Sequence, residues 1–252
     1  MSLVLSIFPG IDLLGRAFEE EGFCIVRGPD HLWGGEIKTF HPPAGVFDGV
    51  IGGPPCQMFS AMKRLNPACG EKIGNLIPEF ERVVAEARPQ WFVMENVPGA
   101  PTPVVNAYGV HTQFLRDVWV GGETSRPRSI SFGSLLWANR SGTFPIETLA
   151  LHRPDPEPAV LSSYRKVPVA LGGSRKRKKT ADGARHGPAD GPRMSIADMF
   201  RLQGVPTDFL IDAPFTVDGK RKAIANGVPI PMGRAIARAV KRVMAPEAVE
   251  VG

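Results

Sequence analysis

The stretch Gly53-Pro54-Pro55-Cys56-Gln57 constrains this chain most, because it places a thiol on a turn directly after an apolar run. Residues 47–52 (FDGVIG) predict a short buried strand bounded by turn residues. Glycine allows close approach of the backbone, and two prolines fix the direction in which the chain leaves the sheet. The pattern predicts that Cys56 lies at the carboxyl end of a strand, where open α/β sheets bind their ligands.

Cys56 alone would fit a small buried structural thiol equally well, but two more strand-like runs carry polar groups. Residues 88–94 form an apolar run that ends in Glu95-Asn96, and Arg126 and Arg128 precede a strand-like run at 129–133. A thiol can attack, a carboxyl can hold or protonate a ring nitrogen, and an arginine can bind a carbonyl oxygen. Together these groups indicate a catalytic site.

At this point the chain resembles the cytosine-C5 DNA methyltransferase family. Thr124 stands where that family has the glutamine of its Gln-x-Arg-x-Arg motif. Five elements in the family's order carry the resemblance: Pro54-Pro55-Cys56-Gln57, Glu95-Asn96-Val97, the Arg126 and Arg128 pair, residues 195–209 with Arg201-Leu202-Gln203-Gly204, and Ala225-Asn226-Gly227-Val228-Pro229. One Pro-Pro-Cys is a weak signal, whereas five ordered elements are a strong one.

The resemblance implies a fold and a division into domains. We expect an α/β protein with a doubly wound, Rossmann-like, mostly parallel sheet of the class I methyltransferase type. Residues 1–135 would form the catalytic and S-adenosylmethionine-binding domain. Residues 136–214 would form a short basic target recognition region with a docking helix, and residues 215–252 would return to the catalytic domain.

The resemblance also implies the reaction. A methyl group would pass from S-adenosyl-L-methionine to C5 of a cytosine flipped out of duplex DNA, leaving S-adenosyl-L-homocysteine. Cys56 would add to C6, Glu95 would hold N3 and the exocyclic amine, and Arg128 with Arg126 would steady the O2 side. The sequence does not identify the base that removes the C5 proton.

The cofactor residues are expected on turns that follow strands. The apolar run from Leu3 to Phe8 leads through a glycine-containing turn into a predicted helix that extends to Phe23, and such a unit offers backbone N–H groups to a ligand. Asp12 and Leu13 stand where the family commonly has glycines. By resemblance the cofactor residues are Phe8, Gly10, Ile11 and Asp12 on this turn, Asp30 at the ribose, Glu36 and Ile37 at the adenine, and Pro54 and Asn226 nearby; no metal is implied.

Charge is concentrated in one part of the chain. The formal net charge is +5, and residues 140–193 carry 11 Lys/Arg against 5 Asp/Glu. The excess centres on Arg175-Lys176-Arg177-Lys178-Lys179. A solvated loop or a nuclear-localisation-like run would explain this segment, and the alternative is a phosphate-contacting surface for nucleic acid. By resemblance the segment occupies the slot where the family inserts its target recognition region, which implies double-stranded DNA as the partner.

Composition and length argue against a membrane-spanning protein and against a cysteine-based metal site. The 252 residues suit one large domain, or one domain with a small insert. Cys24, Cys56 and Cys69 lack metal-ligand spacing, and no apolar run reaches the roughly 20 residues that span a bilayer. We expect a monomer in the cytoplasm of a bacterial or phage-infected cell, without a membrane partner or a signal peptide.

Other segments predict scaffold. Ser195 and Asp198 predict a helix start, and residues 201–203 are expected to dock the recognition region onto the catalytic domain. Residues 236, 240, 243 and 244 predict a buried helical stripe, residues 78–87 a helix, and residues 58–72 a lid.

Three alternatives remain open from the sequence. A tRNA cytosine methyltransferase relative would share the Pro-Pro-Cys and Glu-Asn-Val motifs. A catalytically inert DNA-binding homologue is disfavoured by the intact Cys56, Glu95, Arg126 and Arg128, whereas Asp12 and Thr124 keep it open. Transfer of a modified group in place of methyl also remains open because of Asp12.

Overall fold

The structure, a computed structural model, describes residues 1–59, 74–138, 142–149 and 195–245. Its elements are β1 (Leu3–Ile7), α1 (Leu13–Glu20), β2 (Cys24–Arg27), η1 (His31–Trp33), η2 (Ile37–Thr39), β3 (Gly49–Gly52), α3 (Ile77–Ala87), β4 (Trp91–Asn96), β5 (Gly109–Arg116), η3 (Asp117–Val120), β6 (Pro127–Ser134), η4 (Leu135–Trp137), α5 (Ile196–Gln203), α6 (Val217–Asn226) and α7 (Ile230–Met244).

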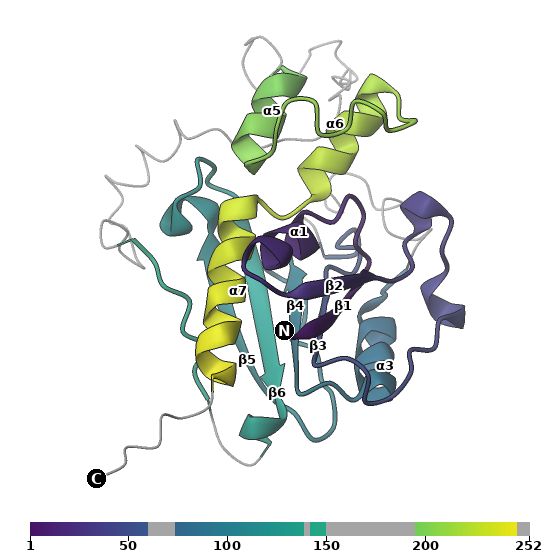
Figure 1. Cartoon of the computed structure of the whole chain (residues 1–252), viewed down its shortest axis with the longest axis vertical. Helices are drawn as coiled ribbons and strands as arrows, with labels where there is room; N and C mark the ends of the chain where they lie inside the picture. The colour runs from purple at the N-terminus through teal and green to yellow at the C-terminus, as the bar shows by residue number, and fades with distance from the viewer. Residues whose placement is uncertain (60–73, 139–141, 150–194, 246–252) are drawn as a thin grey trace, which may run out of the picture.

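Six strands form one sheet in the order β2-β1-β3-β4-β6-β5 (Figure 1). The pairs β1–β2, β1–β3 and β3–β4 are parallel. β6 runs antiparallel between β4 and β5. The reversal brings the start of β6 to the same edge of the sheet as the ends of β3 and β4.

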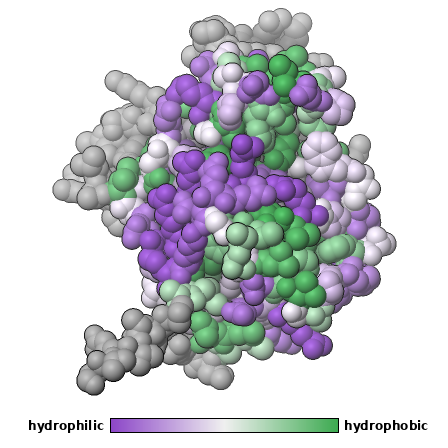
Figure 2. All heavy atoms as spheres, in the orientation of Figure 1, coloured by the Kyte–Doolittle hydropathy of each residue, from purple (hydrophilic) through white to green (hydrophobic). Residues whose placement is uncertain are grey.

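Helices cover both faces of the sheet, so the predicted doubly wound α/β architecture is confirmed. α1 and α7 pack side by side on one face, and α3 covers the other (Figure 1). Two ion pairs join the C-terminal end of α1 to α7. Arg234 lies 2.6 Å from Glu20, and Arg238 lies 2.8 Å from Glu21. A hydrophilic band crosses this face over α7 and α1 (Figure 2).

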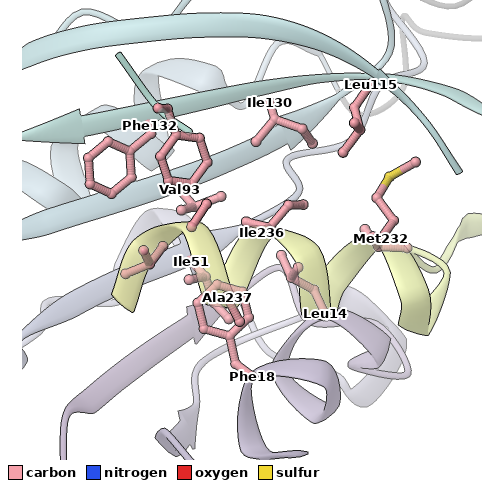
Figure 3. Packing of buried hydrophobic residues seen from close by; sticks show 14 of the residues in the cluster. Leu14, Phe18, Ile51, Val93, Leu115, Ile130, Phe132, Met232, Ile236 and Ala237 are labelled. Carbon is pink, nitrogen blue, oxygen red and sulfur yellow. The ribbon is translucent and has the colours of Figure 1, made fainter. Parts of the chain in front are cut away.

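The alternation of side chains along β4 divides the core in two. Trp91 and Val93 point to the cluster beneath α1 and α7, whereas Phe92 and Met94 point to the cluster beneath α3. Figure 3 shows Met232, Ile236 and Ala237 of α7 facing Val93, Ile130 and Phe132 of the sheet, beside Leu14 and Phe18 of α1. The predicted stripe on α7 is therefore core, with Val243 and Met244 at its margin.

α5 and α6 lie beyond the carboxyl ends of the parallel strands (Figure 1). They enclose a third cluster that includes Met199, Phe200 and Ile224, and Leu13 and Ala17 of α1 contribute to it. Ser195 caps α5, because its hydroxyl oxygen accepts the Asp198 N–H at 3.0 Å. The predicted start of this helix is confirmed.

Several boundaries differ from the sequence-based expectation. The helix predicted to reach Phe23 ends at Glu20, because Gly22 adopts a left-handed φ of 86° and turns the chain into β2. Phe23 instead packs with Phe18 and Trp91. The helix predicted over 78–87 spans Ile77–Ala87. β5 was not predicted, although Val110, Thr112 and Phe114 alternate along it as strand-favouring residues.

Candidate active site

Cys56 lies on the turn after β3. The carbonyl of Cys56 accepts the Phe59 N–H at 2.9 Å, which closes the turn. Gly52 is required in the strand before it, because a Cβ atom there would lie 2.6 Å from the carbonyl oxygen of Ile7. Asn96 ties this turn to the end of β4, since its Nδ2 donates to the carbonyl of Pro54 at 3.1 Å. The predicted position of Cys56 at a strand end is confirmed.

Glu95 and Arg128 form a buried ion pair beside this turn. The Arg128 Nε contacts Glu95 Oε1, with side chains 13% and 10% exposed. In the antiparallel ladder Glu95 pairs with Ile130, which places Arg128 just beyond the end of β4. Gly53 makes room for the acid, because a Cβ atom at this position would lie 3.0 Å from Glu95 Oε2. The structure thus brings Glu95 and Arg128 together beside the Cys56 turn.

The environment of Cys56 favours the neutral thiol. Burial raises the pKa of Cys56, and the negative charge of Glu95 raises it further. The positive charges of Arg128 and Arg126 lower that pKa, but they do not outweigh the first two effects. A thiolate at this position therefore needs either a higher pH or compensation of the Glu95 charge.

Arg126 is more deeply buried than Arg128, with 4% of its surface exposed. Its Nη1 donates to the carbonyl of Ala225, and its Nη2 donates to the carbonyl of Asn226 at 3.3 Å. Burial and the nearby charge of Arg128 lower the pKa of the Arg126 guanidinium. The guanidinium contacts of the two arginines differ: Arg126 engages α6, and Arg128 engages Glu95.

Thr124, the departure from the family's glutamine, has a structural partner. Its Oγ1 donates to Asp117 Oδ2 at 2.7 Å, and both residues are fully buried. Burial raises the pKa of Asp117, and the two hydrogen bonds from Thr124 lower it in part. Thr124 therefore closes the loop between η3 and β6 and fixes the chain just before Arg126.

The turn at residues 8–12, between β1 and α1, has an unusual backbone. Phe8, Gly10 and Asp12 all adopt left-handed φ angles, of 54°, 56° and 53°. Of these three, Phe8 has the most strained backbone, because bulky side chains rarely adopt a left-handed φ. Such strain is found most often at functional sites. No atom lies within 4 Å of the place where a Gly10 Cβ would stand, so the backbone is open there.

Asp12 points into the protein. It caps α1, and its Oδ1 accepts the Gly15 N–H at 3.1 Å and the Ser6 hydroxyl at 2.8 Å. Its Oδ2 lies 2.8 Å from the Arg27 Nε on β2. Burial raises the pKa of Asp12, although Ser6 and Arg27 oppose that shift. With 6% of its surface exposed, Asp12 supports the turn from behind.

The other acids expected at the cofactor are also hydrogen-bonded to backbone. Asp30 accepts the Gly10 N–H at 2.9 Å and the Leu32 N–H at 2.7 Å, so it links turn 8–12 to η1. Glu36 accepts the Lys38 N–H at 2.9 Å. Ile37 is only 2% exposed and packs in the core beneath α3.

Sequence reasoning missed the backbone partners of three supporting side chains, although it expected residues 201–203 to dock the recognition region. Trp33 donates its indole N–H to the Gly10 carbonyl at 2.6 Å, and Asn96 bridges to Pro54 as described above. Gln203 donates from Nε2 to the carbonyl of Ile224 at 2.7 Å. Their partners are backbone groups far away in sequence, so no local signal could identify the contacts. The expected site residue Asn226 contributes its backbone carbonyl to Arg126.

Some predictions lie outside the described residues: the basic run 175–179, Cys69 and most of the predicted lid. In the part of the chain that is described, no helix is long and apolar enough to cross a membrane, and no cluster of three potential metal ligands occurs. Two cavities of about 380 and 360 Å³ lie away from Cys56, one beside Asp48 and Gln90 and one beside Arg234 and Arg238.

Comparison with known proteins supports the resemblance. The chain is 30% identical over 142 residues to the Type II methyltransferase M.XorII of Xanthomonas oryzae, and 31% identical over 139 residues to M.HindV of Haemophilus influenzae. These alignments span 45% and 51% of this chain but only 31% and 42% of the relatives. M.MthTI of Methanothermobacter thermautotrophicus is 24% identical, over 95% of this chain and 97% of that protein.

Solved structures show the same fold. A protein described as a DNA modification methyltransferase encoded within an E. coli prophage aligns with a TM-score of 0.63 at 15% identity, covering 98% of this chain and 100% of its own. A DNMT2 variant from Spodoptera frugiperda aligns with a TM-score of 0.59 at 14% identity, covering 95% and 99%.

A family model supplies the assignment. The model described as C-5 cytosine-specific DNA methylase matches residues 35–108 and 154–242, which together make up more than half of the chain. The first range contains Cys56 and Glu95, and the second contains Gln203 and Asn226. The chain therefore belongs to the C-5 cytosine-specific DNA methylase family.

Proposed function

We propose that this protein transfers the methyl group of S-adenosylmethionine to C5 of a cytosine in double-stranded DNA through a covalent bond between Cys56 and C6. The carrying observation is the convergence of a thiol-bearing turn and the Glu95–Arg128 pair at one edge of the sheet. An acid inside an apolar fold next to a cysteine suits addition to an electron-poor ring.

The chemistry follows from the ring. C5 of cytosine becomes nucleophilic when the Cys56 thiolate adds to C6, because the addition breaks the aromaticity and leaves an enamine. Glu95 holds N3 and the exocyclic amine, and Arg128 holds the O2 side, so that charge developing on the ring is stabilised. C5 would then take the methyl group as the S–CH3 bond of S-adenosylmethionine breaks and S-adenosylhomocysteine leaves, a base would remove the C5 proton, and the C6–S bond would break to restore the Cys56 thiolate.

Cysteine activation fits this order of events. Before the cytosine binds, burial and the charge of Glu95 raise the pKa of Cys56. A proton taken up between Glu95 and N3 as the Cys56 thiol loses its own would compensate that negative charge, so binding of the cytosine would favour the thiolate. The nucleophile is then formed mainly where its target is present.

The turn at residues 8–12 fits the methyl donor in part. Open backbone at Gly10, left-handed φ angles on the turn and the nearby Asp30 and Trp33 provide an accessible rim. When bound, S-adenosylmethionine supplies an electrophilic methyl group. Phe8, Gly10, Ile11, Asp30 and Glu36 would bind it, with Pro54 and Asn226 nearby; Asp12 and Ile37 would act from behind, because both are buried.

A cytosine inside a duplex has its C6 stacked between neighbours, so the reaction requires the base to leave the helix at a cost of roughly a few kcal/mol. We propose residues 136–214 as the region that recognises the DNA, residues 1–135 as the catalytic domain and residues 215–252 as the returning segment. α5 packs against α6 across the second of these boundaries, so the recognition region would be joined to the returning segment through this helix pair.

Bisulfite sequencing of DNA from cells that express the protein tests the activity, the target base and the sequence context together. We expect methylation of cytosine in one short sequence context, lost in the Cys56→Ser variant. Duplex DNA with 5-fluorocytosine at the same site should trap a protein adduct, because no C5 proton can leave. Methylation of tRNA but not of duplex DNA would replace the proposed substrate, and an absence of both would support an inert homologue.

A further inference from the structure

Two buried side chains hold the C-terminal end of α6. Carbonyls in the last turn of a helix have no partner within the helix, yet four consecutive carbonyls at residues 224–227 all accept hydrogen bonds from outside. Arg126 donates to the carbonyls of Ala225 and Asn226, and Gln203 donates from Nε2 to those of Ile224 at 2.7 Å and Gly227 at 3.4 Å.

The two donors come from different regions and are both buried. Arg126 immediately precedes β6 and is 4% exposed, whereas Gln203 is the last residue of α5 and is 0% exposed. A cation at the C-terminal end of a helix also interacts favourably with the helix dipole. Removing one buried donor would leave carbonyls without partners, which costs more than the bond itself contributes.

The held segment touches the other parts of the proposed site. A Cβ atom at Gly227 would lie 2.6 Å from Leu13 Cδ1, so this turn packs directly on the start of α1 after turn 8–12. Arg126 lies two residues before Arg128, which contacts Glu95. One turn of chain thus joins the α5–α6 pair to both the catalytic carboxylate and the strained turn.

We propose that Arg126 and Gln203 act as one clamp that positions the α5–α6 pair against the Glu95–Arg128 ion pair. Arg126 is then a positioning residue, and Arg128 is the arginine that touches the base. This inference rests on the proposed function and refines it. Its basis is that both Nη groups of Arg126 donate to α6, whereas Arg128 pairs with Glu95.

The test compares Arg126→Lys, Gln203→Met and the double variant with the parent. Lysine keeps the charge without the planar fork, and methionine keeps the volume without the amide. The matched control is Arg234→Gln on α7, an exposed arginine that pairs with Glu20 at 2.6 Å. kcat and KM for duplex DNA are measured at a temperature well below the thermal unfolding midpoint of each variant. The affinity for S-adenosylhomocysteine is measured by calorimetry.

We expect each single variant to lower kcat about tenfold or more, and the double variant to fall within about twofold of the worse single, because coupled residues are not additive. The control should retain kcat within about twofold. S-adenosylhomocysteine affinity should change less than about threefold in every variant, since no clamp residue is proposed to bind it.

Gln203→Met with parental kcat would overturn the clamp, even if Arg126→Lys does not fold. Multiplicative losses in the double variant would also overturn it and would favour direct contact of Arg126 with the base. If the variants unfold at lower temperature but keep the parental kcat, Arg126 and Gln203 have a merely structural role and the clamp is overturned. If the parent transfers no methyl group, the proposed function fails; the clamp then stands or falls on whether the two losses in unfolding free energy are coupled or additive.

Discussion

The strand ends that carry Glu95 and Arg128 differ from turn 8–12 in what their polar groups bind. At the strand ends, Arg128 and Glu95 contact each other beside a thiol. Around turn 8–12, Asp12 and Asp30 hold the protein's own backbone N–H groups at Gly15, Gly10 and Leu32. The first arrangement has groups to offer a substrate, whereas the second uses much of its charge to shape the chain.

The difference teaches how far a motif transfers a role. Side chains at the ends of adjacent strands converge because the ladder fixes their spacing. Acids on turns can face a ligand or support the turn, and the same motif position permits both. Substitutions at the strand ends should therefore change the chemistry, whereas those around turn 8–12 should separate into binding and support.

Replacing Cys56, the proposed nucleophile, should have the largest effect. We expect Cys56→Ser to lower methyl transfer by at least about 10³-fold, because a hydroxyl is far less acidic and less nucleophilic than a thiol. S-adenosylhomocysteine affinity and the unfolding midpoint should stay near parental values. Cys24→Ser, an exposed position on β2, is the matched control. Turnover within about tenfold of the parent would contradict a covalent role for Cys56.

Glu95→Gln should come next, with a loss in kcat of about 10²- to 10³-fold, within the range of general acid–base catalysis. The carboxyl is needed most as charge builds on the ring, so KM for S-adenosylmethionine should change little. Single-turnover kinetics on duplex DNA measures the effect. A change confined to the KM for S-adenosylmethionine would show that Glu95 binds the cofactor and not the base.

The reactivity of Cys56 should depend on pH with a definite sign. Burial and Glu95 raise the pKa of Cys56, so the neutral thiol persists to higher pH than in free cysteine, and alkylation should rise at correspondingly higher pH. Glu95→Gln should move the alkylation midpoint down, and Arg128→Gln should move it up. Mass spectrometry of the Cys56 peptide after iodoacetamide treatment reports this. A midpoint below that of glutathione would contradict the prediction.

The smallest effects should separate Asp30 from Asp12. Asp30→Ala should weaken S-adenosylhomocysteine binding about tenfold, because it removes a proposed ribose contact and releases Gly10. Asp12→Asn should change that affinity less than about threefold, since its carbonyl oxygen can still accept from Ser6 and Gly15 and asparagine tolerates a left-handed φ. Asp12→Ala should cost about 1 kcal/mol of stability through the lost cap.

Calorimetry and thermal unfolding on the three variants decide this part of the comparison. Equal losses of affinity in Asp30→Ala and Asp12→Asn would show that both acids bind the cofactor. Loss only in Asp12→Asn would reverse the assignment, and the group transferred by the enzyme would then need to be identified.

The positions of Cys56 and Glu95 could be predicted from the sequence more fully than the rest of the candidate site. Apolar runs ending in Cys56 and Glu95 predicted strand ends, and strand ends of one sheet edge converge by geometry. The ion pair of Asp12 could not be predicted, because its partner Arg27 lies on the neighbouring strand β2. The clamp on α6 could not be predicted either, since Arg126 and Gln203 reach the end of α6 only through tertiary packing.

The placement of Glu95 within a strand has a consequence for local opening. Glu95 pairs with Ile130 in the β4–β6 ladder, in a region where Val93 and Phe132 are fully buried. Such ladders exchange their amide hydrogens only through near-global unfolding, whereas short turns open at low free energy. Glu95 should thus stay in place while the neighbouring Cys56 turn opens locally. Backbone amides around Glu95 should therefore exchange slowly, and those of the Cys56 turn should exchange fast.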